Sequence, residues 1–424
     1  MIEKVLSRNN LRAAYQQVLS NKGAAGIDGM QVADLKPHLQ KKWSAISLSI
    51  INNNYVPQAI KGIEIPKSNG KVRLLGIPTV SDRFLQQAVY QTIMPHFEAE
   101  FKAYSYGFRP KRNAQQAVEQ SQKYINAGNN YIVDTDLKSF FDEVEHSKLL
   151  QLLYRKVKCC PVLRLIRLWL KAPILINGRL VKRTKGIPQG SPLSPLLSNI
   201  MLHELDKHLE CKGLLYVRYA DDFSIYTRSQ KQAETIEKEV HLFLKERLNL
   251  PINQEKSGIR KPLSFEILGY KFVSAFEKGS KGQYQLTVSA KAWRNLNEKL
   301  KEATRKTTPM RFDIRMQKLK AIQRGWLNYF RLGKIWGKLR SLDGWLRSRI
   351  RYSIWHAWKK PKRKRKNLIR LGVAPNMAYA WSYTRMGGWA TAQSPILKNT
   401  ITEARLTQRG YQSMLKYYEK ITHT

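Results

Sequence analysis

Two short acidic segments hold the side chains best suited to chemistry in this sequence. Asp221 and Asp222 are adjacent and lie between two strand-like apolar arms, so the pattern predicts a hairpin with both carboxylates at its turn. Neighbouring carboxylates repel each other unless a cation bridges them or water screens them. The pair therefore indicates either a site for a hard divalent cation or an ordinary exposed turn.

A second acidic segment favours the metal site. Residues 131–133 are a short apolar run that predicts a buried strand, and Asp134 and Asp136 follow it. Carboxylates at the ends of neighbouring strands can hold two divalent cations a few ångströms apart. In nucleotidyl transfer, one such cation activates the attacking hydroxyl and the other stabilises the leaving pyrophosphate.

A mixed α/β region has to position these acids. Up to about residue 275 the sequence alternates strand-like and helix-like segments. Residues 215–219 and 223–227 are the expected arms of the acidic hairpin, and residues 83–91 and 230–248 are expected amphipathic helices. We therefore expect an α+β fold for this part of the chain.

A different composition begins near residue 289. Residues 291–370 contain 26 Lys and Arg against 4 Asp and Glu, so half of the net charge lies in under a fifth of the chain. Apolar residues recur there at helical spacing, which predicts helices with one apolar and one basic face. These apolar residues are Met316, Leu319, Ile322, Trp326 and Tyr329. The run 359–366 interrupts the pattern and predicts a basic linker before a small last domain.

The overall charge indicates a polyanionic partner. Lys and Arg number 75 against 31 Asp and Glu, which gives +44 and a pI near 10.2. Nucleic acid is the usual partner of such a chain, and a basic ribosomal or membrane-surface protein is the alternative. The three cysteines show no zinc-binding spacing, and the N-terminus has no hydrophobic signal core. We expect a soluble, intracellular protein without a membrane partner.

The acidic segments belong to an ordered set of motifs. Residues 131–142 and 219–222 resemble the A and C motifs of the polymerase palm in reverse transcriptases encoded by group II introns. Further segments resemble this family in its own order: residues 23–29, 65–78, 106–110, 186–195, 253–257, 268–270 and 325–330. The resemblance covers nearly the whole chain. The last stretch lacks the His/Asn/Cys cluster of an endonuclease, so the chain is similar to the compact class without that domain.

The resemblance implies a right-hand polymerase with an α+β fold. Its fingers and palm, with an antiparallel sheet and an N-terminal extension, would occupy residues 1–275. An α-helical thumb or maturase domain would follow at 285–365, and a small DNA-binding domain at 366–424. The implied activity is RNA-directed DNA polymerisation, with binding of a group II intron RNA to assist splicing and retrohoming. The alternatives are a reverse transcriptase domesticated for DNA repair or phage defence, and a splicing factor without polymerase activity.

The resemblance also implies the catalytic residues. Asp136, Asp221 and Asp222 match the metal-binding triad, and the backbone carbonyl of Leu137 would also reach the metal. The expected cofactor is two Mg²⁺ ions, for which Mn²⁺ can substitute. Family spacing favours Asp136 over Asp134, because the bulky residue below the incoming sugar lies five positions after Asp136.

The same comparison implies a deoxynucleotide site. Its expected residues are Lys67, Arg73, Phe141, Gln189, Gly190 and Lys256. Lys67 and Arg73 flank a turn that can close on a triphosphate. Phe141 would occupy the space of a ribose 2′-hydroxyl. Without the motifs, these patterns would indicate a solvated charged hairpin, a core phenylalanine and a surface lysine.

Nucleic-acid contacts are expected along the motifs and the basic helices. The candidates are Arg109, Gly269, Tyr270, Arg324, Trp326, Lys334, Lys338 and Arg340. Most tryptophans at helical spacing are core residues, and only a few would stack on bases. The implied partners are an RNA template, a DNA primer, the intron RNA and a target DNA, in the bacterial cytoplasm and at the nucleoid when bound to DNA.

Overall fold

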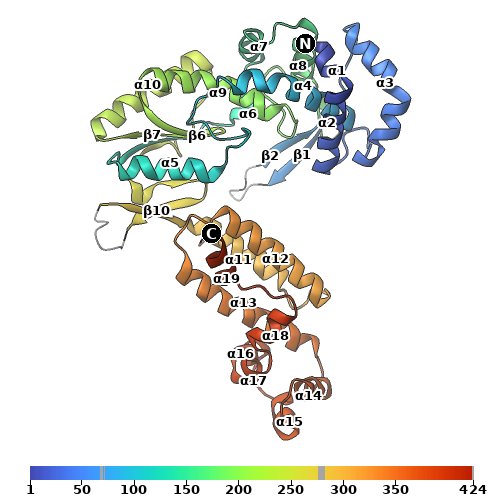
Figure 1. The fold of residues 1–424 in the computed structure, drawn as a ribbon, viewed down its shortest axis with the longest axis vertical. Helices are drawn as coiled ribbons and strands as arrows, with labels where there is room; N and C mark the ends of the chain where they lie inside the picture. The colour runs from blue at the N-terminus through green and yellow to red at the C-terminus, as the bar shows by residue number, and fades with distance from the viewer. Residues whose placement is uncertain (67–69, 71, 276–281, 423–424) are drawn as a thin grey trace. The chain divides into compact units, whose positions relative to one another are not determined.

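Two compact units make up the chain. The computed structural model describes residues 1–66, 70, 72–275 and 282–422. The units are Met1–Lys261 and Pro262–Thr424, and each is described by itself (Figure 1). Both combine helices with strands, as expected for an α+β protein. No helix in the described ranges is long and apolar enough to cross a membrane.

The first unit is built around a four-stranded antiparallel sheet. Its strands, in spatial order, are β6 (Leu215–Tyr219), β7 (Asp222–Thr227), β3 (Tyr131–Thr135) and β8 (Gly258–Arg260). The predicted buried strand and the predicted acidic hairpin are therefore confirmed. β3 is central because Ile132 and Val133 are fully buried, whereas polar residues occupy its exit.

Helices pack on this sheet and bury its apolar residues. α10 (Gln230–Leu248) packs on β3, β7 and β8, while α5 (Ala114–Asn126) packs on β6. α4 (Val80–Glu98) and α9 (Ser194–Cys211) are long and mostly buried. The two predicted amphipathic helices lie within α4 and α10 and are confirmed. The remaining helices of this unit are α1 (Ile2–Leu6), α2 (Arg8–Asn21), η1 (Val32–Asp34), α3 (Leu35–Ile51), α6 (Phe140–Glu143), α7 (His146–Tyr154) and α8 (Cys160–Lys171).

A second sheet lies in the same unit. Its order is β2 (Val72–Ile77), β1 (Ile60–Pro66), β4 (Ile174–Ile176) and β5 (Arg179–Val181). β1 and β2 form an antiparallel hairpin, and β1 pairs with β4 in parallel. Lys67, the residue after β1 in the sequence, lies outside the described residues. The hairpin nevertheless places Arg73 on β2, opposite Ile65.

The second unit starts with strands and continues as helices. A short sheet of order β11 (Tyr284–Val288), β10 (Tyr270–Ser274) and β9 (Glu266–Ile267) follows η2 (Pro262–Ser264). The long helices are α11 (Ala290–Ala303), α12 (Phe312–Tyr329) and α13 (Trp336–Ala357). The short helices are α14 (Pro361–Arg370), α15 (Pro375–Ser382), α16 (Gly388–Gln393), α17 (Pro395–Thr400), α18 (Glu403–Gln408) and α19 (Met414–Thr422).

The end of the chain packs against the long helices. α19 contacts α12 and α13. The buried Asp343 carboxylate on α13 accepts hydrogen bonds from the hydroxyls of Tyr411 and Ser413 and from the backbone of Met414 and Leu415. Four donors satisfy a carboxylate that would otherwise be buried without partners. Residues 411–415 therefore belong to the same compact unit as the long helices.

One expectation about the second unit is wrong. The run 359–366 was expected to be a linker, but α14 begins at Pro361, whose fixed φ suits the first helical position. Leu368 is fully buried and α14 packs on α15, so tertiary packing outweighs the repulsion among the basic residues. The compact units divide the chain after Lys261, because β10 pairs with both β9 and β11 within the second unit. The division into functional domains at 1–275, 285–365 and 366–424 stays a prediction.

Candidate active site

The acidic turn joins β6 to β7 and has a tight backbone. Tyr219 pairs with Asp222, so only Ala220 and Asp221 lie between the paired residues. Ala220 has a φ of +59°, a left-handed conformation typical of such hairpins but disfavoured for a residue with a Cβ. Asp221 follows it directly. The turn thus fixes the backbone that carries both carboxylates.

The three predicted aspartates lie together at the ends of neighbouring strands, on one side of the sheet. Thr135 pairs with Phe223, which places Asp136 beside Asp222 on the neighbouring strand. Burial, together with repulsion from Asp221 and Asp136, raises the pKa of Asp222 to about 6. Burial and the charge of Asp136 also raise the pKa of Asp221, while Arg73 and Arg218 oppose this effect. The carboxylates therefore share one electrostatic environment.

Asp136 is held by residues of another predicted motif. Its Oδ2 atom accepts a hydrogen bond of 2.8 Å from Asn253 Nδ2 and lies 3.3 Å from Lys256 Nζ. Its backbone N–H donates to Ser257 Oγ at 3.0 Å. Lys256, which was predicted to contact the nucleotide, forms an ion pair with Asp136. Asn253 was not singled out from the sequence, because an asparagine in a polar motif carries no signal of its partner.

Asp134 has a different partner. Its Oδ2 atom accepts a hydrogen bond of 2.8 Å from Arg260 Nε on β8. Burial raises the pKa of Asp134 and the arginine opposes this effect. Leu137, the other predicted metal contact on this segment, has a buried side chain and forms a backbone bridge with Ile252. Asp134 is thus paired with an arginine, and Asp136 acts more strongly than Asp134 on the pKa of Asp222.

A cavity of about 440 Å³ gathers most of the predicted nucleotide-site residues. Arg73, Phe141, Gln189, Gly190 and Asp221 all line it. Its other lining residues are Val18, Asn21, Gly23, Leu75, Arg83, Phe108, Ser191, Pro192, Ser194 and Pro195. Segments far apart in the sequence therefore converge here. Phe108 belongs to the predicted motif 106–110 but was given no role of its own, and nothing in the local sequence marks the contribution from α2.

The loop at Gln189 is joined closely to the β1–β2 hairpin. Arg73 Nε donates to Gln189 Oε1 at 2.5 Å, and the backbone N–H of Gly76 donates to the carbonyl of Gln189 at 2.7 Å. Gly190 has a φ of +115°, and a Cβ at this position would lie 2.7 Å from the Gly76 carbonyl oxygen. Only glycine fits there without displacing backbone. The two predicted nucleotide motifs thus form one wall of the cavity.

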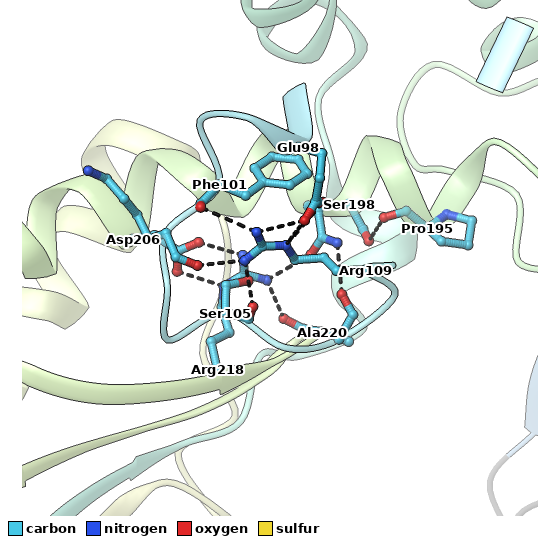
Figure 2. Close-up of polar contacts among 12 residues, drawn as sticks. Glu98, Phe101, Ser105, Arg109, Pro195, Ser198, Asp206, Arg218 and Ala220 are labelled. Atoms are coloured by element: carbon cyan, nitrogen blue, oxygen red, sulfur yellow. Dashed lines mark hydrogen bonds and ion pairs between the residues drawn. The ribbon is translucent and has the colours of Figure 1, made fainter. Parts of the chain in front are cut away.

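A buried ion pair of Arg218 and Asp206 contacts the backbone of the acidic turn at Ala220 (Figure 2). Arg218 and Asp206 are both 0% exposed, and Arg218 Nη2 lies 2.5 Å from Asp206 Oδ2. Arg218 Nη1 donates to the carbonyl of Ala220 at 2.9 Å and to Asn199 Oδ1 at 3.0 Å. Asn199 Nδ2 in turn donates to the carbonyl of Gly107. The network ties the turn to α9 and to the loop at Gly107.

Arg109, which was predicted to contact nucleic acid, is engaged inside the fold. Its guanidinium donates to the Glu98 carboxylate and to the backbone carbonyls of Phe101, Lys102 and Ser105 (Figure 2). The residue is 9% exposed. Because its donors are all engaged inside the fold, a phosphate has no access to them. Its role is to fix the loop that contains it.

The second unit separates its predicted contacts into buried and exposed residues. Tyr270 is 0% exposed and its hydroxyl donates to the Tyr329 carbonyl, so its side chain packs inside this unit. Gly269 has a φ of +81° and lies against the Phe330 ring. Trp326 packs between Trp293 and Phe330, with ring centroids 4.7 and 4.8 Å away. Trp326 therefore contributes to the core here.

The basic candidates on this unit remain exposed. They are Arg324, Lys334, Lys338 and Arg340. Arg324 lies over the Tyr417 ring, Lys338 over Trp293 and Arg340 over Trp336. A cavity of about 840 Å³ between α11 and α13 also exposes cations, since its charged lining residues are Arg294, Lys301 and Lys338. This unit therefore presents positive charge next to aromatic rings.

Comparisons with known proteins match both units. The family model "Reverse transcriptase (RNA-dependent DNA polymerase)" matches residues 65–272, and "Group II intron, maturase-specific domain" matches residues 293–372. Protein YkfC of Escherichia coli (strain K12) is 31% identical over 289 residues, which are 59% of this chain and 76% of YkfC. Group II intron-encoded protein LtrA of Lactococcus lactis subsp. cremoris is 31% identical over 325 residues, 61% of this chain. The chain spans only 54% of LtrA.

One solved structure adds a weaker likeness. A chain of the partial Cas6-RT-Cas1–Cas2 complex aligns with 57% of this chain and 42% of its own length, at 25% identity. The TM-score is 0.37, a similarity too low to bear on the fold or the site.

Proposed function

We propose a mechanism and partners for this chain on the premise that it belongs to the group II intron-encoded reverse transcriptases, a family of RNA-directed DNA polymerases. One observation carries the proposal. Asp136, Asp221 and Asp222 meet at one sheet edge, and Asp221 also lines the cavity that contains Arg73 and Gln189. Carboxylates and phosphate-binding groups around one cavity suit the joining of a deoxynucleotide to a primer.

Divalent cations fit the chemistry of this donor set. In the described part of the chain, no three acidic, histidine or cysteine side chains converge into a ready-made metal cage. Lys256 and Asn253 engage Asp136 instead, so binding a cation there exchanges the ammonium for a metal ion. The carboxylates offer hard oxygen ligands, and their mutual repulsion is relieved by added positive charge.

The three aspartates, with the Leu137 carbonyl, would hold two Mg²⁺ ions or Mn²⁺ in their place. When bound, the ions activate the primer 3′-hydroxyl and stabilise the leaving pyrophosphate. Arg73, with Lys67, would grip the triphosphate, and Gln189 and Gly190 would contact the nucleotide. Lys256, once released from Asp136, would face the phosphates.

Phe141 would select the sugar. Its side chain lines the cavity together with Asp221 and Arg73, and its ring packs edge-on against buried Phe140 at 5.3 Å. A ring held in this way leaves no room for a 2′-hydroxyl below the bound sugar. The enzyme would therefore favour deoxynucleotides over ribonucleotides.

The second unit, Pro262–Thr424 (the basic unit), would bind nucleic acid without reading its sequence. Exposed Arg324, Lys334, Lys338 and Arg340 would contact phosphates of the RNA template, the DNA primer and the intron RNA. We assign fingers and palm to residues 1–275, the thumb to 285–365 and a target-DNA-binding domain to 366–424. Binding the intron RNA would assist splicing and retrohoming, in the cytoplasm and at the nucleoid.

Primer extension tests the polymerase site. Asp221→Asn combined with Asp222→Asn removes both charges at the turn and keeps the side-chain volume. We expect no measurable extension on an RNA template with Mg²⁺, and an unchanged affinity for RNA. Asp313→Asn, an exposed acid on α12, is the matched control and should retain wild-type synthesis. Extension by the purified double variant would refute the assignment.

A further inference from the structure

Phe108 is an exposed aromatic residue at the nucleotide cavity with a strained backbone. Its φ is +60° and it is 47% exposed, although Gly107 and Arg109 on either side are buried. A left-handed conformation is disfavoured for a bulky residue and persists only where the surroundings enforce it. Such outliers cluster at functional sites, so the position calls for a functional explanation.

The neighbouring residues enforce this conformation. The Gly107 carbonyl accepts a hydrogen bond of 2.9 Å from Asn199 Nδ2, and a Cβ at Gly107 would overlap the Ala220 backbone. Arg109 is locked by the Glu98 carboxylate and three backbone carbonyls. The loop is therefore fixed to the acidic turn before Phe108 and to α4 after it.

The cavity beside Phe108 has the composition of a nucleotide site. Arg73 and Arg83 supply positive charge, Asp221 supplies a carboxylate, and Phe108 and Phe141 supply apolar surface. Phe141 is backed by the Phe140 ring, whereas nearly half of the Phe108 surface is open to solvent. Core packing does not account for a side chain left so open.

We propose that Phe108 is a platform on which a nucleobase stacks at the polymerising centre. The inference rests on the proposed function. Every nucleobase has a π-face that stacks on an aromatic ring, so the contact tolerates any sequence, as a copying enzyme requires. The base belongs either to the incoming deoxynucleotide or to the 3′-end of the primer. Locking the loop in advance removes the entropic cost of ordering the ring on binding.

Three variants of Phe108 test the proposal. Phe108→Ala should raise either the KM for deoxynucleotides or the Kd for primer–template about tenfold, the size expected for loss of one base–aromatic stack. Phe108→Trp should retain both values. Phe108→Gly should weaken the same constant while leaving the Tm unchanged or higher, because glycine adopts a positive φ without strain. Tyr154→Ala removes a 57% exposed ring on α7, outside the cavity, and is the matched control.

The outcomes separate the possible sources of the base. A higher KM with unchanged Kd identifies the incoming nucleotide, and a higher Kd identifies the primer end. If the wild type extends primers and Phe108→Ala matches it in both constants, the proposal is overturned. It is also overturned if Phe108→Gly loses Tm as Phe108→Ala does, because the ring then stabilises the fold. A wild-type chain that extends no primer would contradict the proposed function itself.

Discussion

The two units use charged residues in opposite ways. Met1–Lys261 carries a net charge of +17, and at its acidic site the supporting arginines Arg218 and Arg109 are buried with carboxylate partners. Pro262–Thr424 is much shorter and carries +27, mostly as exposed Lys and Arg. A buried pair fixes atoms in place but gains little free energy, whereas exposed cations attract phosphates without fixing geometry. Fixed geometry and exposed positive charge therefore lie in different parts of the chain.

The comparison has one instructive exception. The second unit also buries charged residues, including Asp343 and Arg351. Arg351 Nε donates to the Ile401 carbonyl, and Asp343 holds residues 411–415. Those contacts attach peripheral segments to α13. The exposed basic candidates take no part in them. Buried charge therefore serves architecture in both units, and only the first unit places it under a candidate active site.

Breaking the buried pair should have the largest effect. Arg218→Met leaves Asp206 charged and unpaired, so the free energy of unfolding should fall by about 3–5 kcal/mol. Arg340→Met, at an exposed position, should change it by less than about 0.5 kcal/mol. Urea unfolding measures both values. Adding Asp206→Leu to Arg218→Met should recover much of the loss, and equal losses in the two single variants would break the comparison.

Neutralising part of the basic unit should affect binding but not stability. Lys362, Arg363 and Lys366 are exposed on α14, so replacing all three with Gln should weaken RNA binding about tenfold or more in ~0.1 M salt. The slope of log affinity against log salt should become shallower by about 2, because each lost phosphate contact contributes about 0.7. Filter binding across a salt series measures it. An unchanged slope would show that α14 does not contact phosphate.

Changing Phe141, in the first unit, should alter the selectivity between deoxynucleotides and ribonucleotides without affecting RNA binding. Phe141→Ala opens space below the sugar, so incorporation of ribonucleotides relative to deoxynucleotides should rise about tenfold. RNA affinity should stay at the wild-type value, since the basic unit is untouched. Single-nucleotide incorporation kinetics give the ratio. If the ratio does not change, Phe141 only packs against Phe140.

A buried histidine in the first unit should make the free energy of unfolding fall as the pH is lowered, with a smaller effect than the changes above. His203 lies on α9 near Asp206, and burial lowers its pKa to about 4, below the 6.5 of the unfolded chain. The unfolded state therefore takes up the proton first as the pH falls. Stability present above pH 6.5 is lost between about pH 6.5 and 4.

The size of this loss can be isolated with one variant. Between pH 7 and 5, the loss of unfolding free energy should be about 1 kcal/mol smaller in His203→Gln than in the wild type, after allowance for partial solvent screening. His96→Gln, at an exposed position on α4, should behave like the wild type. Identical pH dependence in His203→Gln and wild type would place the titrating group elsewhere.

Local patterns in the sequence predicted the frame of the site. The apolar run before Asp134 and the alternating arms around Asp221 each occupy a few adjacent residues, and β3, β6 and β7 form where these patterns predict them. Helix periodicity likewise predicted α10. These features depend on neighbours in the chain, so sequence alone sufficed.

Partners brought in by tertiary structure could not be predicted in the same way. Arg109 is a cation in a polymerase-like motif, and only the fold shows that Glu98 and three carbonyls occupy it. Lys256 faces Asp136, which is 120 positions earlier in the sequence. Phe108 belongs to the predicted motif 106–110, but its exposure and left-handed backbone are not properties of residue type and could not be predicted. The basic run became a helix because Leu368 found a buried position.

The joint between β2 and the Gln189 loop bears on how this enzyme could be engineered. Gly76 and Gly190 approach each other there through their backbones, so at these two positions no side chain can be trimmed or enlarged by degrees. A randomised library that includes these glycines would yield mostly inactive clones. Diversity placed at Phe108, Phe141 or Gln189, whose side chains enter the same cavity, would sample graded changes in fidelity and substrate range.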